Sequence, residues 1–155
     1  MRVCYFWYRA LWPQATAALP DAAERIYTGP GTHDYWRVFA QRWTGEDDLV
    51  TIEQDVRIHP GVIPHFAACP YPWCAFGWEV GPGQMSYWWL GCTKFSAWLQ
   101  QEVPLTGEQP GDCAACQPVP CHRHLDVVFQ PVMARLGQEQ PHVHTPPVTH
   151  LRAVA

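Results

Sequence analysis

The spacing of hydrophobic residues in the first third of the chain predicts strands and helices in alternation. Residues 3–8 and 24–28 are short runs with aromatic and β-favouring side chains, so both are predicted strands. Between Thr32 and Gly45 the apolar residues recur at helical spacing, which predicts a helix that the glycine ends. Residues 49–52 are uniformly apolar or β-branched, as expected for a central strand covered on both faces.

The middle of the chain resumes this alternation after a long irregular stretch. Residues 60–83 are dominated by proline, glycine and aromatic residues, and we predict an ordered loop with room for one short helix. A strand over residues 85–90, a turn at 91–93 and a helix over 95–101 follow. Alternating strands and helices are typical of α/β proteins, so we predict an α/β fold with a mixed sheet flanked by helices.

The last third begins with an insertion that has no regular pattern. Residues 104–124 are rich in cysteine, proline and glycine, whereas residues 125–136 resume helical spacing despite Pro131. The tail over residues 141–150 is predicted to be extended and contains several histidines. A chain of 155 residues has room for one domain with a substantial core, so we predict a single domain that carries this insertion.

Composition supports a folded, loop-rich protein. Hydrophobic residues make up 48% and charged residues 15% of the chain, and 16 prolines argue for stiff connections between short elements. The formal net charge of −4 gives no global reason to expect strong nucleic-acid binding, which normally needs a basic face. A local basic patch is compatible with this charge.

The cysteines and the first residues bear on the cellular compartment. Seven cysteines are an odd number, and the chain begins without the apolar stretch and cleavage site of a secretory signal. No apolar run reaches the roughly 18 residues that a membrane helix needs. We therefore expect a cytoplasmic protein with reduced thiols and no membrane partner.

Two carboxylates, Glu53 and Asp55, lie just past the predicted central strand and are separated by one residue. Because α/β proteins bind ligands at the carboxyl ends of their strands, this pair could offer oxygen ligands to Mg²⁺ or Mn²⁺. Such an ion would bridge a substrate diphosphate and take up charge as the bond to a sugar breaks. The alternative is a solvated strand end with two unrelated carboxylates.

Four segments resemble, in their order, motifs of small GT-A-type (family 2-like) glycosyltransferases. Residues 52–56 resemble the strand and acid-x-acid (DXD-like) motif that holds the metal and the nucleotide diphosphate. Residues 88–96 resemble the strand and turn on the acceptor side. Residues 124–126 resemble the segment with the catalytic carboxylate of inverting members, and residues 148–150 the late histidine that completes the metal shell. The resemblance implies a compact, Rossmann-like sheet.

The resemblance also implies roles for individual residues. Asp126 would be the general base that takes a proton from the acceptor hydroxyl. Asp55 would bind the metal directly, whereas Glu53 would bind it through water or hydrogen-bond the donor. His150 would be the imidazole ligand, with His144 as the next choice. From the residues alone, Asp126 is equally compatible with an ordinary carboxylate at a helix N-terminus, and each tail histidine with a surface position.

Further residues are predicted to contact the donor or the acceptor. Tyr8 and Arg9 end the first predicted strand, where the enzymes that this chain resembles meet the nucleotide, although Arg9 is also compatible with a surface charge. Thr93 and Lys94 lie in the segment that resembles the acceptor side. Among the tryptophans, whose flat rings match sugars and nucleobases, Trp73 is preferred because it lies in a proline-stiffened loop soon after the acid pair.

The insertion carries a candidate zinc site. Cys113, Cys116 and Cys121, followed by His122 and His124, offer enough soft ligands for a four-coordinate structural Zn²⁺. Such a site would organise a segment that has no core of its own. The alternative is a loop that happens to contain thiols.

Three other cysteines, Cys69, Cys74 and Cys92, flank the predicted acceptor side. Buried apolar thiols are the default interpretation of such residues. His59 and His65 lie nearby in sequence, so a second zinc cluster is an alternative interpretation.

The preferred hypothesis is therefore a metal-dependent, inverting glycosyltransferase that moves a hexosyl or pentosyl group from a nucleotide-sugar donor to a hydroxyl acceptor. One candidate acceptor is a hydroxymethylated base in DNA, because small proteins that this chain resembles occur in phage-like settings. A phage protein of this kind would act in the host cytoplasm. Two alternatives stay open: a structural-zinc interaction module, and a metal-dependent phosphate-ester hydrolase. A groove for DNA would be lined by Arg25, Arg37, Arg57, Lys94 and Arg123.

Overall fold

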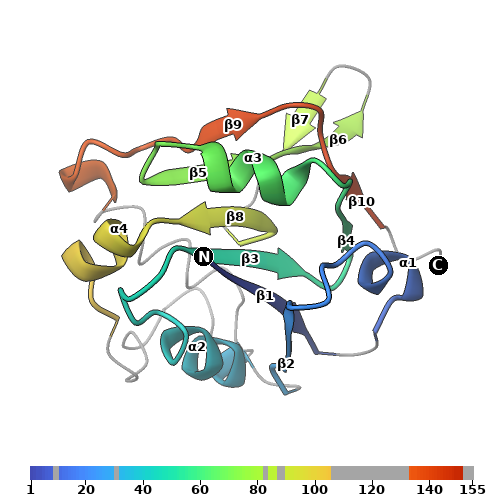
Figure 1. Ribbon diagram of the computed structural model, residues 1–155, viewed down its shortest axis with the longest axis horizontal. Coiled ribbons are helices and arrows are strands. Elements are labelled where there is room, and N and C mark those ends of the chain that lie inside the picture. Colours follow the sequence, from blue (N-terminus) through green and yellow to red (C-terminus); the bar gives the residue numbers. More distant parts are fainter. Residues whose placement is uncertain (9–10, 30–31, 82–83, 87–89, 106–132, 152–155) are drawn as a thin grey trace.

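The computed structural model of the chain describes residues 1–8, 11–29, 32–81, 84–86, 90–105 and 133–151 (Figure 1). In chain order, the elements within these ranges are β1 Arg2–Trp7, α1 Pro13–Thr16, β2 Glu24–Tyr27, α2 Thr32–Ala40, β3 Leu49–Glu53, β4 Val56–Arg57, α3 Val62–Ala68, β5 Trp73–Phe76, β6 Trp78–Gly81, β7 Gln84–Ser86, β8 Cys92–Phe95, α4 Ala97–Glu102, β9 His142–His144 and β10 Thr149–His150.

Six of the described strands form a central sheet in the order β2-β1-β3-β8-β5-β9. β1 is parallel to both β2 and β3, and β8 lies antiparallel between β3 and β5. β9 pairs parallel with β5, so β8 alone runs against the other strands of this sheet. A small sheet of β4 and β10 lies beyond the carboxyl end of β3, and another of β6 and β7 follows β5 on the side of β9 (Figure 1).

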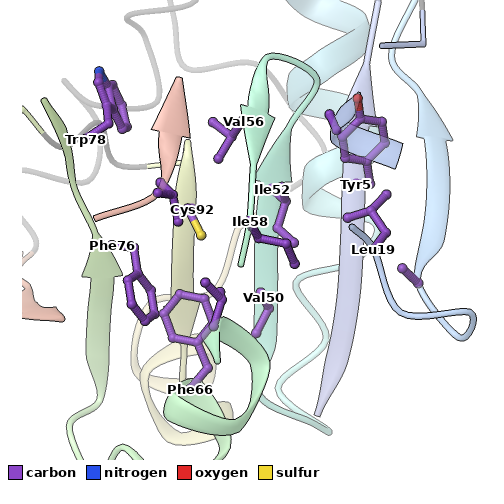
Figure 2. Close-up of a cluster of buried hydrophobic side chains, with 14 of the residues drawn as sticks. Tyr5, Leu19, Val50, Ile52, Val56, Ile58, Phe66, Phe76, Trp78 and Cys92 are labelled. Carbon is purple, nitrogen blue, oxygen red and sulfur yellow. The ribbon is translucent and has the colours of Figure 1, made fainter. Parts of the chain in front are cut away.

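Side chains from successive strand positions point to opposite faces of the sheet and build two apolar clusters. On one face, Val50 and Phe76 pack with residues of α1 and α3. Figure 2 shows Phe66 of α3 beside Phe76, and their ring centroids are 5.2 Å apart. On the other face, Phe6 and Phe95 pack with residues of α2 and α4. The sheet is therefore covered by helices on both faces.

The chain reverses its direction across the sheet after β2. It passes from β1 through α1 to β2 on one side, and then from β2 through α2 to β3 on the other side of β1. Right-handed crossovers that move in opposite directions place their helices on opposite faces, as is found for α1 and α2. The carboxyl ends of β1 and β3 therefore form a switch point, where open α/β sheets bind ligands.

The predicted α/β class with a mixed sheet and flanking helices is confirmed. The prediction of a loop over residues 60–83 was wrong in part, because this stretch contains β5 and β6 as well as α3. The predicted helix after residue 95 begins at Ala97, since Ser96 caps it by accepting a hydrogen bond from the amide of Leu99 at 3.1 Å.

Some predictions fall where the structure gives no description. Most of the insertion over residues 104–124 and most of the predicted helix over 125–136 lie outside the described residues, and the single-domain organisation stays a prediction. Among the described residues, no helix is both long enough and apolar enough to cross a bilayer.

Candidate functional site

Gln54 joins the carboxyl ends of β1 and β3 at the switch point. Its side-chain oxygen accepts a hydrogen bond from the amide of Tyr8 at 3.0 Å, and its carbonyl accepts one from the hydroxyl of Tyr5 at 2.8 Å. Burial raises the pKa of Tyr5 to about 12, with a hydrogen bond to the backbone of Trp12 acting in the opposite direction. The hydroxyl of Tyr5 therefore stays protonated at neutral pH and ties the end of β3 to β1.

Asp55 and His150, which the sequence analysis assigned to one metal, are in contact. Oδ2 of Asp55 lies 3.2 Å from Nε2 of His150. The contact arises because β4, which begins directly after Asp55, pairs antiparallel with β10 and places Val56 opposite His150. The amide of Leu151 also donates a hydrogen bond to the carbonyl of Asp55, which fixes the two backbones together.

Trp78 completes the surroundings of this pair. Its ring stacks on the imidazole of His150, with centroids 5.1 Å apart and an interplanar angle of 26°. Trp78 itself is buried, whereas the side chains of Asp55 and His150 are 31% and 28% exposed. The imidazole is thus held in one plane while both polar groups remain accessible to solvent. Figure 2 shows Trp78 close to the small strand β10.

Glu53, the first carboxylate of the acid pair, lies half-buried at the end of β3. Its backbone amide donates to the carbonyl of Gly91 at 2.9 Å. Strand alternation puts Glu53 on the face that carries Leu49, away from the face of Ile52. Glu53 is therefore not a partner of His150 merely because it precedes Asp55 by two residues.

Three side chains that the sequence predicts to contact the donor or the acceptor are buried. Trp73, Thr93 and Lys94 are only 2%, 0% and 2% exposed. Trp73 packs in the apolar cluster under α2 and α4, and it is Trp78 that lies beside His150. The ammonium of Lys94 donates to the carbonyl of Cys69 at 2.6 Å and lies 3.7 Å from Oδ2 of Asp48, so its role is structural.

Several predicted site residues lie outside the part of the chain that the structure describes. They are Arg9, Asp126, Cys113, Cys116, Cys121 and His124. Tyr8 is described and is half-buried next to Gln54 at the end of β1. The predicted zinc site of the insertion and the predicted general base therefore stay predictions.

His144 belongs to a second polar group, formed with Cys69 and Cys74. One ligand atom from each of the three side chains lies within 4.8 Å of the others. Cys69 ends α3, Cys74 lies in β5 and His144 in β9, so three elements meet here. The sequence offered His144 as a ligand of the Asp55 metal, but the structure places it among these thiols.

Burial governs the electrostatics of this second group. It raises the pKa of Cys74, as does a hydrogen bond with Cys69, while the charge of Lys94 acts in the opposite direction. Burial lowers the pKa of His144, and the neighbouring His142, His65 and Lys94 lower it further. The imidazole is therefore neutral at neutral pH, and its Nε2 is buried with no hydrogen-bond partner among the described residues.

Comparison with protein-family models, with curated proteins and with solved structures found no match for this chain. The described residues define an α/β protein in which one polar group lies at the switch point of the sheet and another at the edge formed by β5 and β9. Since a fold alone does not determine an activity, function has to be argued from the chemistry of these groups.

Proposed function

We propose that this chain is a metal-dependent glycosyltransferase that moves a hexosyl or pentosyl group, with inversion, from a nucleotide-sugar donor to a hydroxyl acceptor. The observation that carries the proposal is the contact of Asp55 with His150 next to the switch point between β1 and β3. This is where an open α/β sheet binds its ligand, and two groups able to bind a cation meet there.

The donor atoms of this pair fit Mn²⁺ or Mg²⁺. A carboxylate oxygen beside one imidazole suits Mn²⁺, whereas thiolates would indicate a different metal. Adjacent ligands of an octahedral cation with bonds near 2.1 Å are about 3 Å apart. Oδ2 of Asp55 and Nε2 of His150 are 3.2 Å apart, so the two atoms need little movement to share a cation. When bound, the cation supplies positive charge for the departing diphosphate.

The neighbouring residues suit the binding of a donor. Tyr8 continues the chain beyond β1 and is half-buried beside Gln54, where it could contact the nucleotide. Trp78 holds the imidazole plane of His150 and so orients the ligand nitrogen. The proposal gives Glu53, half-buried at the end of β3, a hydrogen bond to the donor sugar or a contact with the cation through water. The resemblance assigns the acceptor proton to Asp126, and that role is part of the proposal.

The acceptor is proposed as a hydroxyl-bearing molecule, and a hydroxymethylated base in DNA is the case to test. Arg57 is exposed two residues after Asp55, at the end of β4, and its guanidinium lies 3.5 Å from the hydroxyl of Thr149, so a cationic side chain flanks the site. Lys94 is buried and cannot contribute to a DNA groove. If DNA is the acceptor, its affinity will fall steeply with salt, and weak salt-insensitive binding would exclude it.

The direct test is a thermal-shift screen of nucleotide sugars with and without Mn²⁺. A ligand at about 100 times its Kd stabilises the folded state by about 2.7 kcal/mol, which raises the Tm of a chain of this size by roughly 5–11 °C. We expect one donor to give such a shift only with Mn²⁺, and Asp55→Asn and His150→Gln to abolish it. Each shift is measured from the variant's own Tm without ligand.

The matched control is Asp21→Asn, which removes an exposed carboxylate elsewhere and should keep the full shift. A shift that needs no metal, or that survives in Asp55→Asn, would contradict the proposal. Turnover of a phosphate ester without any glycosyl donor would instead identify a hydrolase. Tightly held zinc with no affinity for any nucleotide sugar would identify an interaction module.

A further inference from the structure

We propose that Cys69, Cys74 and His144 form a structural zinc site that fastens the strand β9 to the rest of the sheet. This site is separate from the Asp55–His150 pair, and its ligands differ in kind. Two thiolates and an imidazole are the soft and borderline donors that Zn²⁺ prefers over Mn²⁺ or Mg²⁺.

The spacing of the three donors suits a tetrahedral ion. Bonds of about 2.3 Å to sulfur and 2.0 Å to nitrogen put the ligands of a tetrahedral Zn²⁺ roughly 3.5–3.8 Å apart. The ligand atoms of Cys69, Cys74 and His144 lie within 4.8 Å of one another. A contraction of about 1.3 Å or less would bring them onto one ion, which side-chain rotation can supply.

The surroundings of His144 argue that its ring is held in place for a ligand. Its imidazole stacks on Phe76 with centroids 5.0 Å apart and meets the edge of Phe66 at 5.9 Å. Its Nε2 is buried and makes no hydrogen bond among the described residues. A buried polar atom without a partner is costly, so a ring kept in this position by two aromatic neighbours needs a further partner.

The charges around the cluster also suit a bound ion. Zn²⁺ with two thiolates and a neutral imidazole is neutral, and both thiols release their protons on binding. The ammonium of Lys94 is held next to the cluster by the carbonyl of Cys69, and its charge favours the thiolate of Cys74. Asp48 in turn lies 3.7 Å from that ammonium, which balances its charge.

The fourth ligand is either water or His65. Nδ1 of His65 lies 2.6 Å from the carbonyl of Gly61, and donating there leaves its Nε2 unprotonated and available to a metal. Its ring lies 5.9 Å from that of His144, so a change of rotamer would be needed to reach the ion.

The structural consequence falls on the C-terminal part of the described chain. β9 has three residues and lies at the edge of the sheet, where β5 is its one partner among the described strands (Figure 1). Such a short edge strand has few hydrogen bonds to hold it. A zinc ion bound by residues of α3, β5 and β9 would hold β9 on the sheet. It would thereby also fix the position of the chain that leads from β9 to β10.

The test begins with the variant Cys113→Ser/Cys116→Ser, which removes the other predicted zinc site and leaves this one intact. Protein purified without a histidine tag is stripped with a chelator and titrated with Co²⁺. We expect about one thiolate-bound Co²⁺ per chain, with the intense near-ultraviolet band of thiolate-to-cobalt charge transfer and the visible bands of a tetrahedral ion. Zn²⁺ should displace the Co²⁺ and remove both sets of bands.

Adding Cys74→Ser to that variant should abolish the charge-transfer band, whereas adding His142→Ala should keep it. His142 is the control because it lies in the same strand, where it stacks on Tyr71 instead of joining the cluster. His65→Ala distinguishes the two candidates for the fourth ligand. A changed visible spectrum would identify His65 as that ligand, and an unchanged spectrum would identify water.

Two results would overturn the proposal. One is the absence of a thiolate-to-cobalt band in Cys113→Ser/Cys116→Ser, which needs no further substitution to interpret. The other is a Cys69–Cys74 disulfide in freshly purified protein, seen as the loss of two hydrogens by mass spectrometry. A nucleotide sugar that binds normally to the zinc-free protein would leave the proposed activity intact, so the two proposals fail independently.

Discussion

Replacing Tyr5 by phenylalanine tests whether one buried hydroxyl holds the switch point together. Tyr5 is fully buried, and its hydroxyl donates to the carbonyl of Gln54 at 2.8 Å. The ring fills the same space in the variant, so no cavity of note is created. The change therefore isolates the hydrogen bond between β1 and the end of β3.

The expected cost follows from the partner that is lost. A buried hydrogen bond contributes about 1 kcal/mol, and leaving its buried partner unsatisfied costs about 1–3 kcal/mol. Because the carbonyl of Gln54 loses its donor, we expect Tyr5→Phe to lower the free energy of unfolding by about 1–3 kcal/mol. The Tm should fall by roughly 2–12 °C.

Urea unfolding followed by tryptophan fluorescence measures this difference, and an unchanged m-value would show that the unfolded state is unaffected. The control is Tyr27→Phe, which makes the same chemical change at a side chain of β2 that is 52% exposed and should alter stability by less than about 0.5 kcal/mol. If Tyr5→Phe is as stable as Tyr27→Phe, the hydroxyl does not secure the switch point and the reasoning is refuted.

Three further outcomes can be checked by the same unfolding assay. Lys94→Met should destabilise the fold by about 1.5–3 kcal/mol, because the carbonyl of Cys69 loses a buried charged donor; wild-type stability would contradict this. Phe66→Ala should lower the free energy of unfolding by about 3–5 kcal/mol, since the ring is fully buried under α3. A smaller loss than that of Lys94→Met would show that neighbouring side chains fill the space left by the ring. The hydrogen bond from Arg42 lowers the pKa of the Glu24 carboxyl in the folded state. The pair therefore stabilises the folded state fully at pH values above the pKa of this carboxyl in the unfolded chain. The stabilisation is lost as the pH falls through the pKa of the carboxyl in the folded state. Both side chains are partly exposed, so Glu24→Gln should cost only about 0.5 kcal/mol at pH 7 and nothing at low pH; a cost that persists in acid would exclude the pair as its source.

The central strands could be predicted from local sequence because their surroundings impose a simple pattern. β1 and β3 lie inside the sheet with helices on both faces, which requires the continuous apolar runs seen in the sequence. β5 has only four residues and follows Pro70 and Pro72, so the local signal indicated a loop. Its partners in β8 and β9 come from later in the chain, and such pairings leave no local mark.

The candidate site was only partly predictable for the same reason. Asp55 could be found from its position after a strand, and His150 from the order of the motifs, but their contact depends on the pairing of β4 with β10. Trp73 seemed suited to stacking because prolines stiffen its surroundings, yet strand alternation turns it into the core. The sequence predicts Lys94 on the acceptor side and in a DNA groove, because an isolated lysine gives no sign that Cys69 and Asp48 will surround it.

The position of β10 late in the chain has a consequence for synthesis. β1, α1, β2, α2 and β3 leave the ribosome first, and their packing can begin while His150 is still untranslated. A nascent chain at that stage would contain Asp55 but lack its imidazole partner, so it could not yet hold the cation as proposed. Cation binding would then become possible only after β10 has been synthesised. A chain cut before β9 would lose the proposed Mn²⁺ or Mg²⁺ site even if its central sheet still folded.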